Sequence, residues 1–403
     1  MNRFVVLFVA ALGILVAGSG PSMAAAAGVT KTQQCIDQIY LRAPDPSTYC
    51  DSVISTLLRG QGLMNGRTLE GNARFNFILA LWNANWAPQG NSPAWVWREL
   101  ASDLIAKGKP QQALQVVSRI VNDPYAILSM RADKAFDPVT ALDPAWFEPA
   151  DAFKRTEDYY RALMAGEPDK LLPVERLAWV LEVTGQYAEA NALLTDALGS
   201  ARVGRWSDSA SMLNWAVQRH AYILIDLGQV DDGLKEFEKA AQLPEDGRPN
   251  VSQVLNMAEA YARNGRPERA LEIVKDGLVA SAYGRMVIND DRAIAYFDLK
   301  DATALAATVT EAKSHAEDGL PVYENMALYV NDMDEAARIL IRRLSDPEKY
   351  TDALQEVQAW KPASSDFDQE IARRRAAMVA RPDVQAAIAS RGRIYSYPTI
   401  QAP

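Results

Sequence analysis

Apolar residues recur at helical spacing through most of the chain, in pairs of runs separated by short breaks. The clearest pair has its apolar residues at Val254, Met257, Ala258 and Tyr261 before the break and at Ala270, Leu271, Val274 and Leu278 after it. Within the break, Gly265 can end a helix in the left-handed conformation, and Pro267 suits the first turn of the next helix. Two helices joined by so short a link pack antiparallel. The pattern therefore predicts a helical hairpin.

The same hairpin pattern is written several times. A small residue is followed seven positions later by glycine and, five positions after that, by another small residue. Its copies are Ala101/Gly108/Ala113, Ala178/Gly185/Ala190, Ala221/Gly228/Gly233 and Ala258/Gly265/Ala270. A decayed fifth copy fits Ala293/Lys300/Leu305, and a sixth runs from Leu320 to Leu344. The small residues mark the points where paired helices cross, because larger side chains would push the backbones apart.

These units resemble tetratricopeptide (TPR) repeats. The resemblance rests on the four regular copies and on their apolar followers Val117, Leu194, Phe237 and Val274. The spacing is 43 residues from Ala190 to Gly233 and 37 from Gly233 to Ala270, looser than the roughly 34 residues of a TPR unit. The resemblance implies an all-α, TPR-like α-solenoid of antiparallel helix pairs, with irregular capping helices.

The pattern divides the chain into four parts. Residues 1–24 are expected to be a signal peptide, and residues 25–92 an N-terminal helical cap, because the terminal helices of a solenoid lack one neighbour. Residues 93–344 hold the repeats, interrupted by an irregular insert at 122–170 where four acid–proline dipeptides predict short helices. Residues 345–403 are expected to form C-terminal helices and an extended tail.

The N-terminal stretch predicts export. Arg3 precedes an apolar run from Phe4 to Ala17, and Ser22-Met23-Ala24 offers a small-x-small cleavage site. We expect cleavage near Ala24 and a periplasmic product. No later stretch approaches the roughly 18 unbroken apolar residues of a membrane helix, so no stable membrane span is expected after cleavage. Retention of the leader as an anchor is the less favoured alternative.

Cys35 and Cys50 are the only cysteines, and both follow the predicted cleavage site. In an exported protein, two close cysteines are expected to form a disulfide. They lack the CxxC spacing and the nearby histidine that a redox or metal site would need. We therefore predict a structural disulfide that fixes the first helices.

The charge argues against nucleic-acid binding, because the formal net charge is -9 and phosphate recognition requires a basic patch. Known catalytic signatures are absent, and the two histidines, His220 and His315, fit interior and helix-end positions. We expect no catalytic residue, no cofactor and no metal. One alternative stays open, a carbohydrate-active or peptidoglycan-associated protein with paired carboxylates, for which Glu175 and Glu182 are candidates.

The TPR resemblance implies a concave groove lined by the first helix of each unit. The candidate groove residues are Trp95, Arg98, Glu175, Trp179, Glu182, Trp215, Gln218, Tyr222, Asp226, Glu259 and Arg263. Large aromatics with mixed charge suit peptide or protein binding. An alternative is that Trp179 and Trp215 fill gaps between repeats. The sequence thus favours a non-catalytic scaffold that binds a protein or peptide in a bacterial-type cell envelope, with a self-assembling structural subunit as a further alternative.

Overall fold

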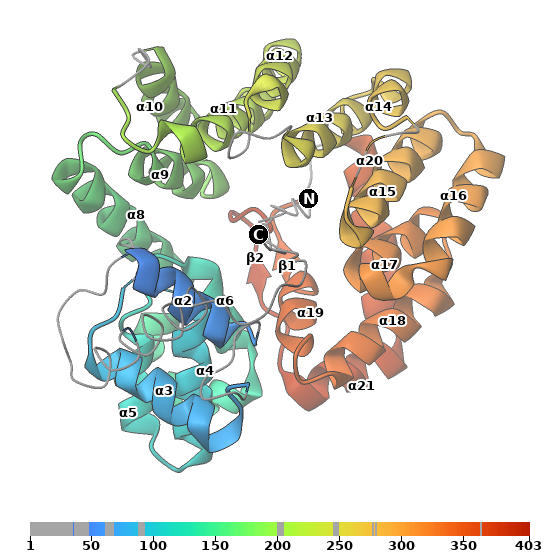
Figure 1. Cartoon of the computed structure of the whole chain (residues 1–403). Coiled ribbons are helices and arrows are strands. Elements are labelled where there is room, and N and C mark those ends of the chain that lie inside the picture. The colour runs from blue at the N-terminus through green and yellow to red at the C-terminus, as the bar shows by residue number, and fades with distance from the viewer. Residues whose placement is uncertain are drawn as a thin grey trace, which may run out of the picture. The chain divides into compact units, whose positions relative to one another are not determined.

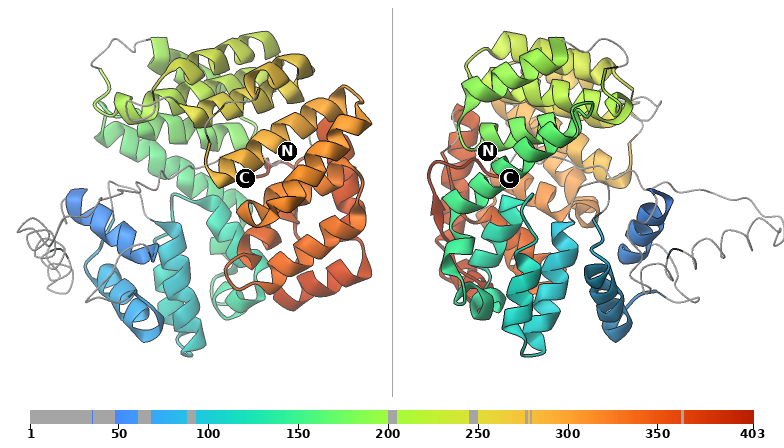
Figure 2. Two further views of the ribbon diagram at one scale, coloured as in Figure 1. Left: turned by 45° about the vertical axis from the view of Figure 1, so that its right-hand side comes forward. Right: turned by 90° about the vertical axis from the view of Figure 1, so that its left-hand side faces the viewer.

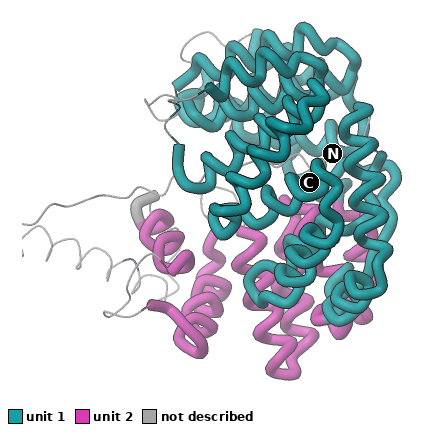
Figure 3. Tube along the Cα trace, turned by 90° about the vertical axis from the view of Figure 1, so that its right-hand side faces the viewer, with its two compact units in different colours: residues 1–8, 132–134, 153–403 teal, residues 9–131, 135–152 magenta. Residues whose placement is uncertain are grey.

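The computed structural model describes residues 35, 48–60, 68–87, 93–199, 205–244, 250–275, 278, 280–362 and 365–403. These residues fall into two compact units (Figure 3). Unit 2 holds the described residues up to 131 together with 135–152, and unit 1 holds residues 132–134 and 153–403. The predicted all-α fold is confirmed, because helices make up almost all of the described regular structure. The predicted signal peptide lies outside the described residues.

Unit 2 contains the first helices of the described chain, except for residues 132–134, which belong to unit 1. They are α2 (Thr48–Leu58), α3 (Gly71–Asn83), α4 (Ala94–Ala106), α5 (Pro110–Val117), α6 (Pro124–Ala132), η2 (Lys134–Phe136), α7 (Asp137–Thr140) and η3 (Pro144–Phe147). The acid–proline segment therefore does form short helices. As in the hairpin predicted around Gly265 and Pro267, Pro110 stands in the first turn of α5 and Gly108 has a left-handed φ of 71°.

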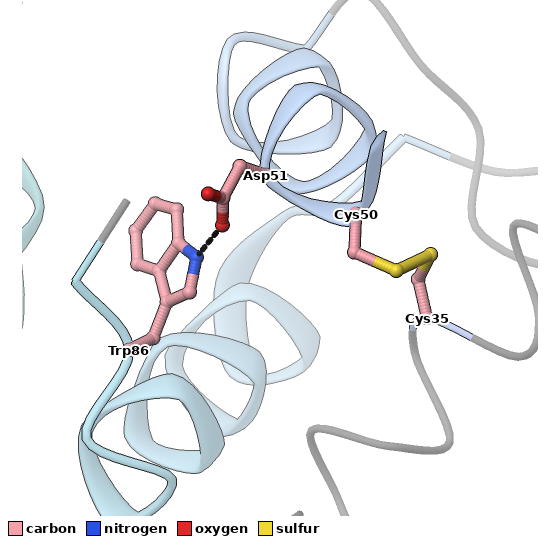
Figure 4. Close-up of a disulfide and its surroundings, with 4 residues drawn as sticks. All are labelled: Cys35, Cys50, Asp51 and Trp86. Atoms are coloured by element: carbon pink, nitrogen blue, oxygen red, sulfur yellow. Dashed lines mark hydrogen bonds between the residues drawn. A yellow bond between two sulfur atoms is a disulfide. The ribbon is translucent and has the colours of Figure 1, made fainter. Parts of the chain in front are cut away.

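The aromatic residues of unit 2 build its core. Trp97 is 1% exposed and meets the rings of Trp82 and Trp86 edge to face, at centroid distances of 5.7 and 6.3 Å. The indole N–H of Trp86 donates to Asp51 Oδ1 at 2.8 Å (Figure 4). The predicted Cys35–Cys50 disulfide is confirmed beside this contact and ties residue 35 to the start of α2.

Unit 1 is a succession of helix pairs. Its elements are α8 (Pro149–Gly166, which begins in unit 2), α9 (Leu172–Val183), α10 (Tyr187–Gly199), α11 (Ser209–Asp226), α12 (Val230–Gln242), α13 (Val251–Arg263), α14 (Pro267–Ile273), α15 (Ala282–Asp298), α16 (Ala302–Ser314), η4 (Ala316–Asp318), α17 (Leu320–Tyr329), α18 (Met333–Ser345), α19 (Tyr350–Glu356), β1 (Ala359–Trp360), α20 (Asp366–Val379), α21 (Pro382–Arg391) and β2 (Ser396–Tyr397). Helices α9 to α14 stack side by side (Figures 1 and 2).

One left-handed residue closes each hairpin link of unit 1. Gly185, Gly228 and Gly265 have φ values of 81°, 80° and 70°. In the two decayed copies, Lys300 and Asn331 take the same position with φ values of 58° and 59°. A residue with a Cβ is disfavoured there by about 1–2 kcal/mol, so the packing of these hairpins must hold the turn in place. The decayed copies therefore keep the hairpin geometry without the glycine.

The helices cross at small residues, as the sequence pattern predicts. Ala178, Ala221, Ala258 and Ala293 are all fully buried. The tightest crossing is at Gly233 on α12, where an added Cβ would lie 2.6 Å from Ile225 Cγ1 and 2.7 Å from the carbonyl oxygen of Ala221. Both contacts are shorter than real Cβ atoms allow, so α11 and α12 approach as closely as they do because this residue is glycine.

Arginines from later elements bind the carbonyl groups that helix ends leave without an intrahelical partner. Arg374 of α20 donates to the carbonyls of Leu328 and Tyr329 at the end of α17, both at 2.8 Å. Arg391 donates to the carbonyls of Leu344 and Ser345 at the end of α18, both at 2.9 Å. These contacts fix the C-terminal helices α20 and α21 onto the last hairpin.

Residues 392–403, here called the tail, follow α21 and pack against other parts of unit 1. Gly392 is buried where an added Cβ would meet the carbonyl oxygen of Ala132 at 2.4 Å. The next residue, Arg393, donates its N–H to the same carbonyl at 2.9 Å. Further on, β2 pairs in parallel with β1, and Tyr397 stacks on Trp360 at a centroid distance of 4.8 Å. Tyr397 of the tail thus packs back onto β1.

The close crossing at Gly233 yields a stability prediction. Gly233→Ala forces α11 and α12 apart, and we expect it to lower the free energy of unfolding in a urea titration by about 1–3 kcal/mol. Gly166→Ala is the matched control, because Gly166 ends α8 with open space around it and no left-handed φ. Equal stability of the two variants would contradict the close-crossing account.

Candidate functional site

The tail lies against one surface of α9, α10 and α11. This surface, called the inner face, is defined by Val183, Tyr187 and Asp226. The N–H of Gln401 donates to the carbonyl of Val183 at 3.0 Å. The side-chain amide of Gln401 donates to Tyr187 Oη at 2.9 Å and to Asp226 Oδ2 at 3.1 Å. In Figure 1 the end of the chain accordingly lies within the curve of helices α9 to α19.

A second segment of the chain, the one that follows β1, also contacts Tyr187. Lys361, directly after β1, donates from Nζ to Tyr187 Oη at 2.7 Å, and its N–H donates to the carbonyl of Ile400 at 2.9 Å. Its ammonium also lies 5.0 Å from the centre of the Tyr187 ring. Tyr187 therefore receives both the β1 end and the tail on the inner face.

Several predicted groove residues continue this face. Trp179 stands one turn before Val183 on α9, and Tyr222 one turn before Asp226 on α11, so each pair shares a helix side. Trp179, Tyr222 and Asp226 are half-buried. The Tyr222 ring also meets Phe237 of α12 edge to face at 4.8 Å. Trp215, two turns before Tyr222, is half-buried as well.

Glu175 and Glu182 are buried in ion pairs. Both lie on α9 and bind the guanidinium of Arg219 on α11, at 3.2 Å from Nε to Glu175 Oε1 and 2.8 Å from Nη1 to Glu182 Oε2. Burial opposes the charge of Arg219, but the two carboxylates more than offset it and raise the pKa of the guanidinium above its usual value. Through these ion pairs, Arg219 holds the α11–α12 hairpin against the α9–α10 hairpin.

The remaining predicted residues of unit 1 also bridge between elements. Gln218 on α11 accepts from the amide of Asn256 on α13 at 3.2 Å. Arg263 on α13 binds Glu259 at 2.7 Å within its own helix and pairs with Asp368 of α20. Polar contacts thus connect α11 to α13, and α13 to the C-terminal helix α20.

Trp95 and Arg98 belong to unit 2 and are described apart from the inner face. Trp95 on α4 is 44% exposed, one of the most exposed large apolar side chains in the described residues. Arg98, on the same helix, lies 5.0 Å from the centre of the Phe136 ring. The two residues thus differ in environment although they are only one turn apart.

Glu259 on α13 and Asp290 and Asp291 on α15 form an acidic cluster in which the pKa values of the two aspartates are raised. Burial raises the pKa of Asp290 to about 7, against the opposing effect of Arg263 and with a further upward effect of Glu259. Burial also raises the pKa of Asp291 well above its usual value, aided by Glu259 and Asp290. Tyr329 on α17 hydrogen-bonds Asp290. The described residues contain no group of His, Cys, Asp and Glu arranged to hold a metal ion.

His220, on α11, lies beside α10. Its Nε2 is 3.0 Å from Asn191 Oδ1 and 3.3 Å from Thr195 Oγ1. Burial lowers the pKa of this imidazole, which favours its neutral form. His315 follows the last residue of α16, as predicted for a cation at a helix end, with Nδ1 3.8 Å from Asp318 Oδ2.

Sequence reasoning missed Tyr187 on the inner face and the two residues that bind it there, Lys361 and Gln401. Tyr187 stands at the start of the second helix of its repeat, where the resemblance assigns no groove role. Lys361 and Gln401 are more than 170 residues away from it along the chain. A usable signal was the apolar and aromatic composition of the tail, which is unusual for a free segment.

No protein-family model and no curated protein matches the chain. In the part of the chain that the structure describes, no helix combines the length and apolar character needed to cross a bilayer.

The buried ion pairs of Arg219 give a second stability prediction. Arg219→Met removes the buried guanidinium that binds both carboxylates, and we expect a loss of about 3–5 kcal/mol in the free energy of unfolding. Adding Glu175→Gln and Glu182→Gln removes the two buried negative charges and is expected to restore at least half of the loss. Arg176→Met, which affects a more exposed and looser 3.4 Å contact to Glu175, is the control. An unchanged free energy of unfolding in Arg219→Met would contradict the stabilising role of these ion pairs.

The protonation of Asp290 predicts a pH dependence. An unfolded aspartate has a pKa of about 3.9, so between about pH 4 and 7 the folded state retains a proton that the unfolded state has lost. Stability should therefore fall as pH rises through this window and level off above it. Asp290→Asn is expected to flatten the slope in urea titrations at pH 4.5–7, whereas Asp298→Asn, at an exposed position on the same helix, leaves it. An unchanged slope in Asp290→Asn would contradict the assignment.

Proposed function

We propose that this chain is a non-catalytic scaffold that binds a protein or peptide on the inner face of unit 1. The observation that supports this most strongly is the seating of the tail. An extended segment is held there by a main-chain hydrogen bond to Val183 and by side-chain hydrogen bonds to Tyr187 and Asp226. A surface that binds one extended segment in this way has the chemistry to bind another.

The surroundings of this contact support the same proposal. Trp179 and Tyr222 continue the inner face by one helical turn on either helix and keep part of their rings exposed. Partly exposed aromatic side chains supply much of the anchoring energy in protein interfaces. Glu175 and Glu182, the residues considered for glycan cleavage, are engaged by Arg219, and we assign them to holding α9 against α11.

The place of action that we propose is the cell envelope, after export. The Cys35–Cys50 disulfide supports it, because disulfides persist in oxidising compartments and are rare in the cytosol. The N-terminal sequence, with Arg3, an apolar run and small residues before Ala24, supports it independently.

A crosslinking pull-down from an envelope extract tests the binding role. We expect the wild-type chain to capture a specific protein or peptide, and Trp179→Ala/Tyr222→Ala to reduce the yield at least tenfold because the aromatic anchors are lost. Leu299→Ala, at an exposed apolar position on another hairpin, is the control and should capture normally. Circular dichroism verifies that both variants stay helical. If the double variant retains every captured partner, the inner face is not the binding surface.

A further inference from the structure

The tail contacts the inner face as a bound peptide contacts its receptor. Tyr397, Ile400, Gln401 and Ala402 are buried, whereas Ser396, Pro398 and Thr399 are exposed. Tyr397 packs on Trp360 of β1, whereas Gln401 contacts the inner face. Between them the chain turns, and the N–H of Ile400 donates to the carbonyl of Tyr397 at 3.2 Å.

The main-chain contact of the tail is made to a backbone carbonyl at the end of α9. Val183 is the last residue of that helix, so its carbonyl has no partner within the helix. At the ends of α17 and α18 the corresponding carbonyls are bound by arginine side chains that belong to folded helices. At α9 the donor is instead the backbone N–H of Gln401. Any extended peptide can offer such an N–H.

The side-chain contact is selective for a carboxamide. The Gln401 amide nitrogen donates to both Tyr187 Oη and Asp226 Oδ2. A glutamate of the same length has no hydrogen to donate when ionised and would bring a second carboxylate against Asp226. An alanine would leave both acceptors without this donor. The contact therefore favours glutamine over alanine, and over glutamate through repulsion by Asp226, part of which the ammonium of Lys361 on the same Tyr187 Oη offsets.

We propose that residues 397–402 are an intramolecular ligand of the inner face, and that the partner presents an extended segment with a carboxamide side chain that displaces them. This inference rests on the proposed function and specifies how its site is regulated. A tethered segment acts at an effective concentration of about millimolar. A partner therefore binds with reduced apparent affinity until the tail is released.

Binding of a fluorescent peptide with the sequence of residues 394–403, followed by anisotropy, tests the proposal on the full chain. We expect Gln401→Glu in the chain to release the tail and to tighten binding of the wild-type peptide at least tenfold over the unaltered chain. A chain lacking residues 394–403, checked by circular dichroism, should bind the peptide equally well. Adding Asp226→Ala to the released chain should abolish the gain.

Two variant peptides serve as matched controls. The peptide with Thr399→Ala changes an exposed position and should bind like the wild-type peptide, whereas the peptide with Gln401→Glu should not bind. The proposal is overturned if the wild-type peptide binds neither the Gln401→Glu chain nor the shortened chain, or if it binds the unaltered chain equally well. If the pull-down captures a partner but the peptide does not bind, this inference is wrong and the proposed function still stands. Peptide binding without any captured partner would contradict the proposed function and, with it, the displacement by a partner, but not the binding of the tail to the inner face.

Discussion

The structure depends on the closure of each helix pair by a single left-handed residue. With Gly185, Gly228 or Gly265 in that position, the chain reverses within a few residues and the second helix must pack antiparallel to the first. Lys300 keeps the same conformation in a decayed copy, although a Cβ disfavours it. The turn is therefore imposed by packing as well as by glycine. Without this reversal, α9, α11 and α13 would not stand side by side as first helices of successive pairs.

Stacked first helices bring polar side chains into the protein interior, where each needs a partner. The partner comes from the next hairpin in the case of Glu182 with Arg219, and from a C-terminal helix in the case of Arg263 with Asp368. At the end of α9 the group that needs a partner is the backbone carbonyl of Val183, and the N–H of Gln401 in the tail supplies it. Polar groups of the array and of the inner face are thus satisfied by segments that are distant in the sequence. In the binding role that we propose, another chain would supply the donor that Gln401 supplies here.

The helix pairs were predictable because periodicity, glycine and proline act locally. The pattern around Gly265 and Pro267 predicts the observed end of α13 at Arg263 and the start of α14. The disulfide was predictable from two neighbouring cysteines. By contrast, the ion pairs of Glu175 depend on Arg219, 44 residues away, and the contact of Tyr187 with Gln401 spans 214 residues. Periodicity shows which residues face inward, but it cannot show which distant segment will meet them, and so the inner face was only partly foreseen.

The central claim, that the inner face holds an extended segment through main-chain and carboxamide contacts, is most directly tested by amide hydrogen exchange of the tail. In the intact chain the N–H of Gln401 donates to the carbonyl of Val183 on α9, and it should exchange at least tenfold more slowly than in the free peptide of residues 394–403. Exchange at the rate of the free peptide would contradict the account, because it would mean that the tail does not occupy the inner face in solution.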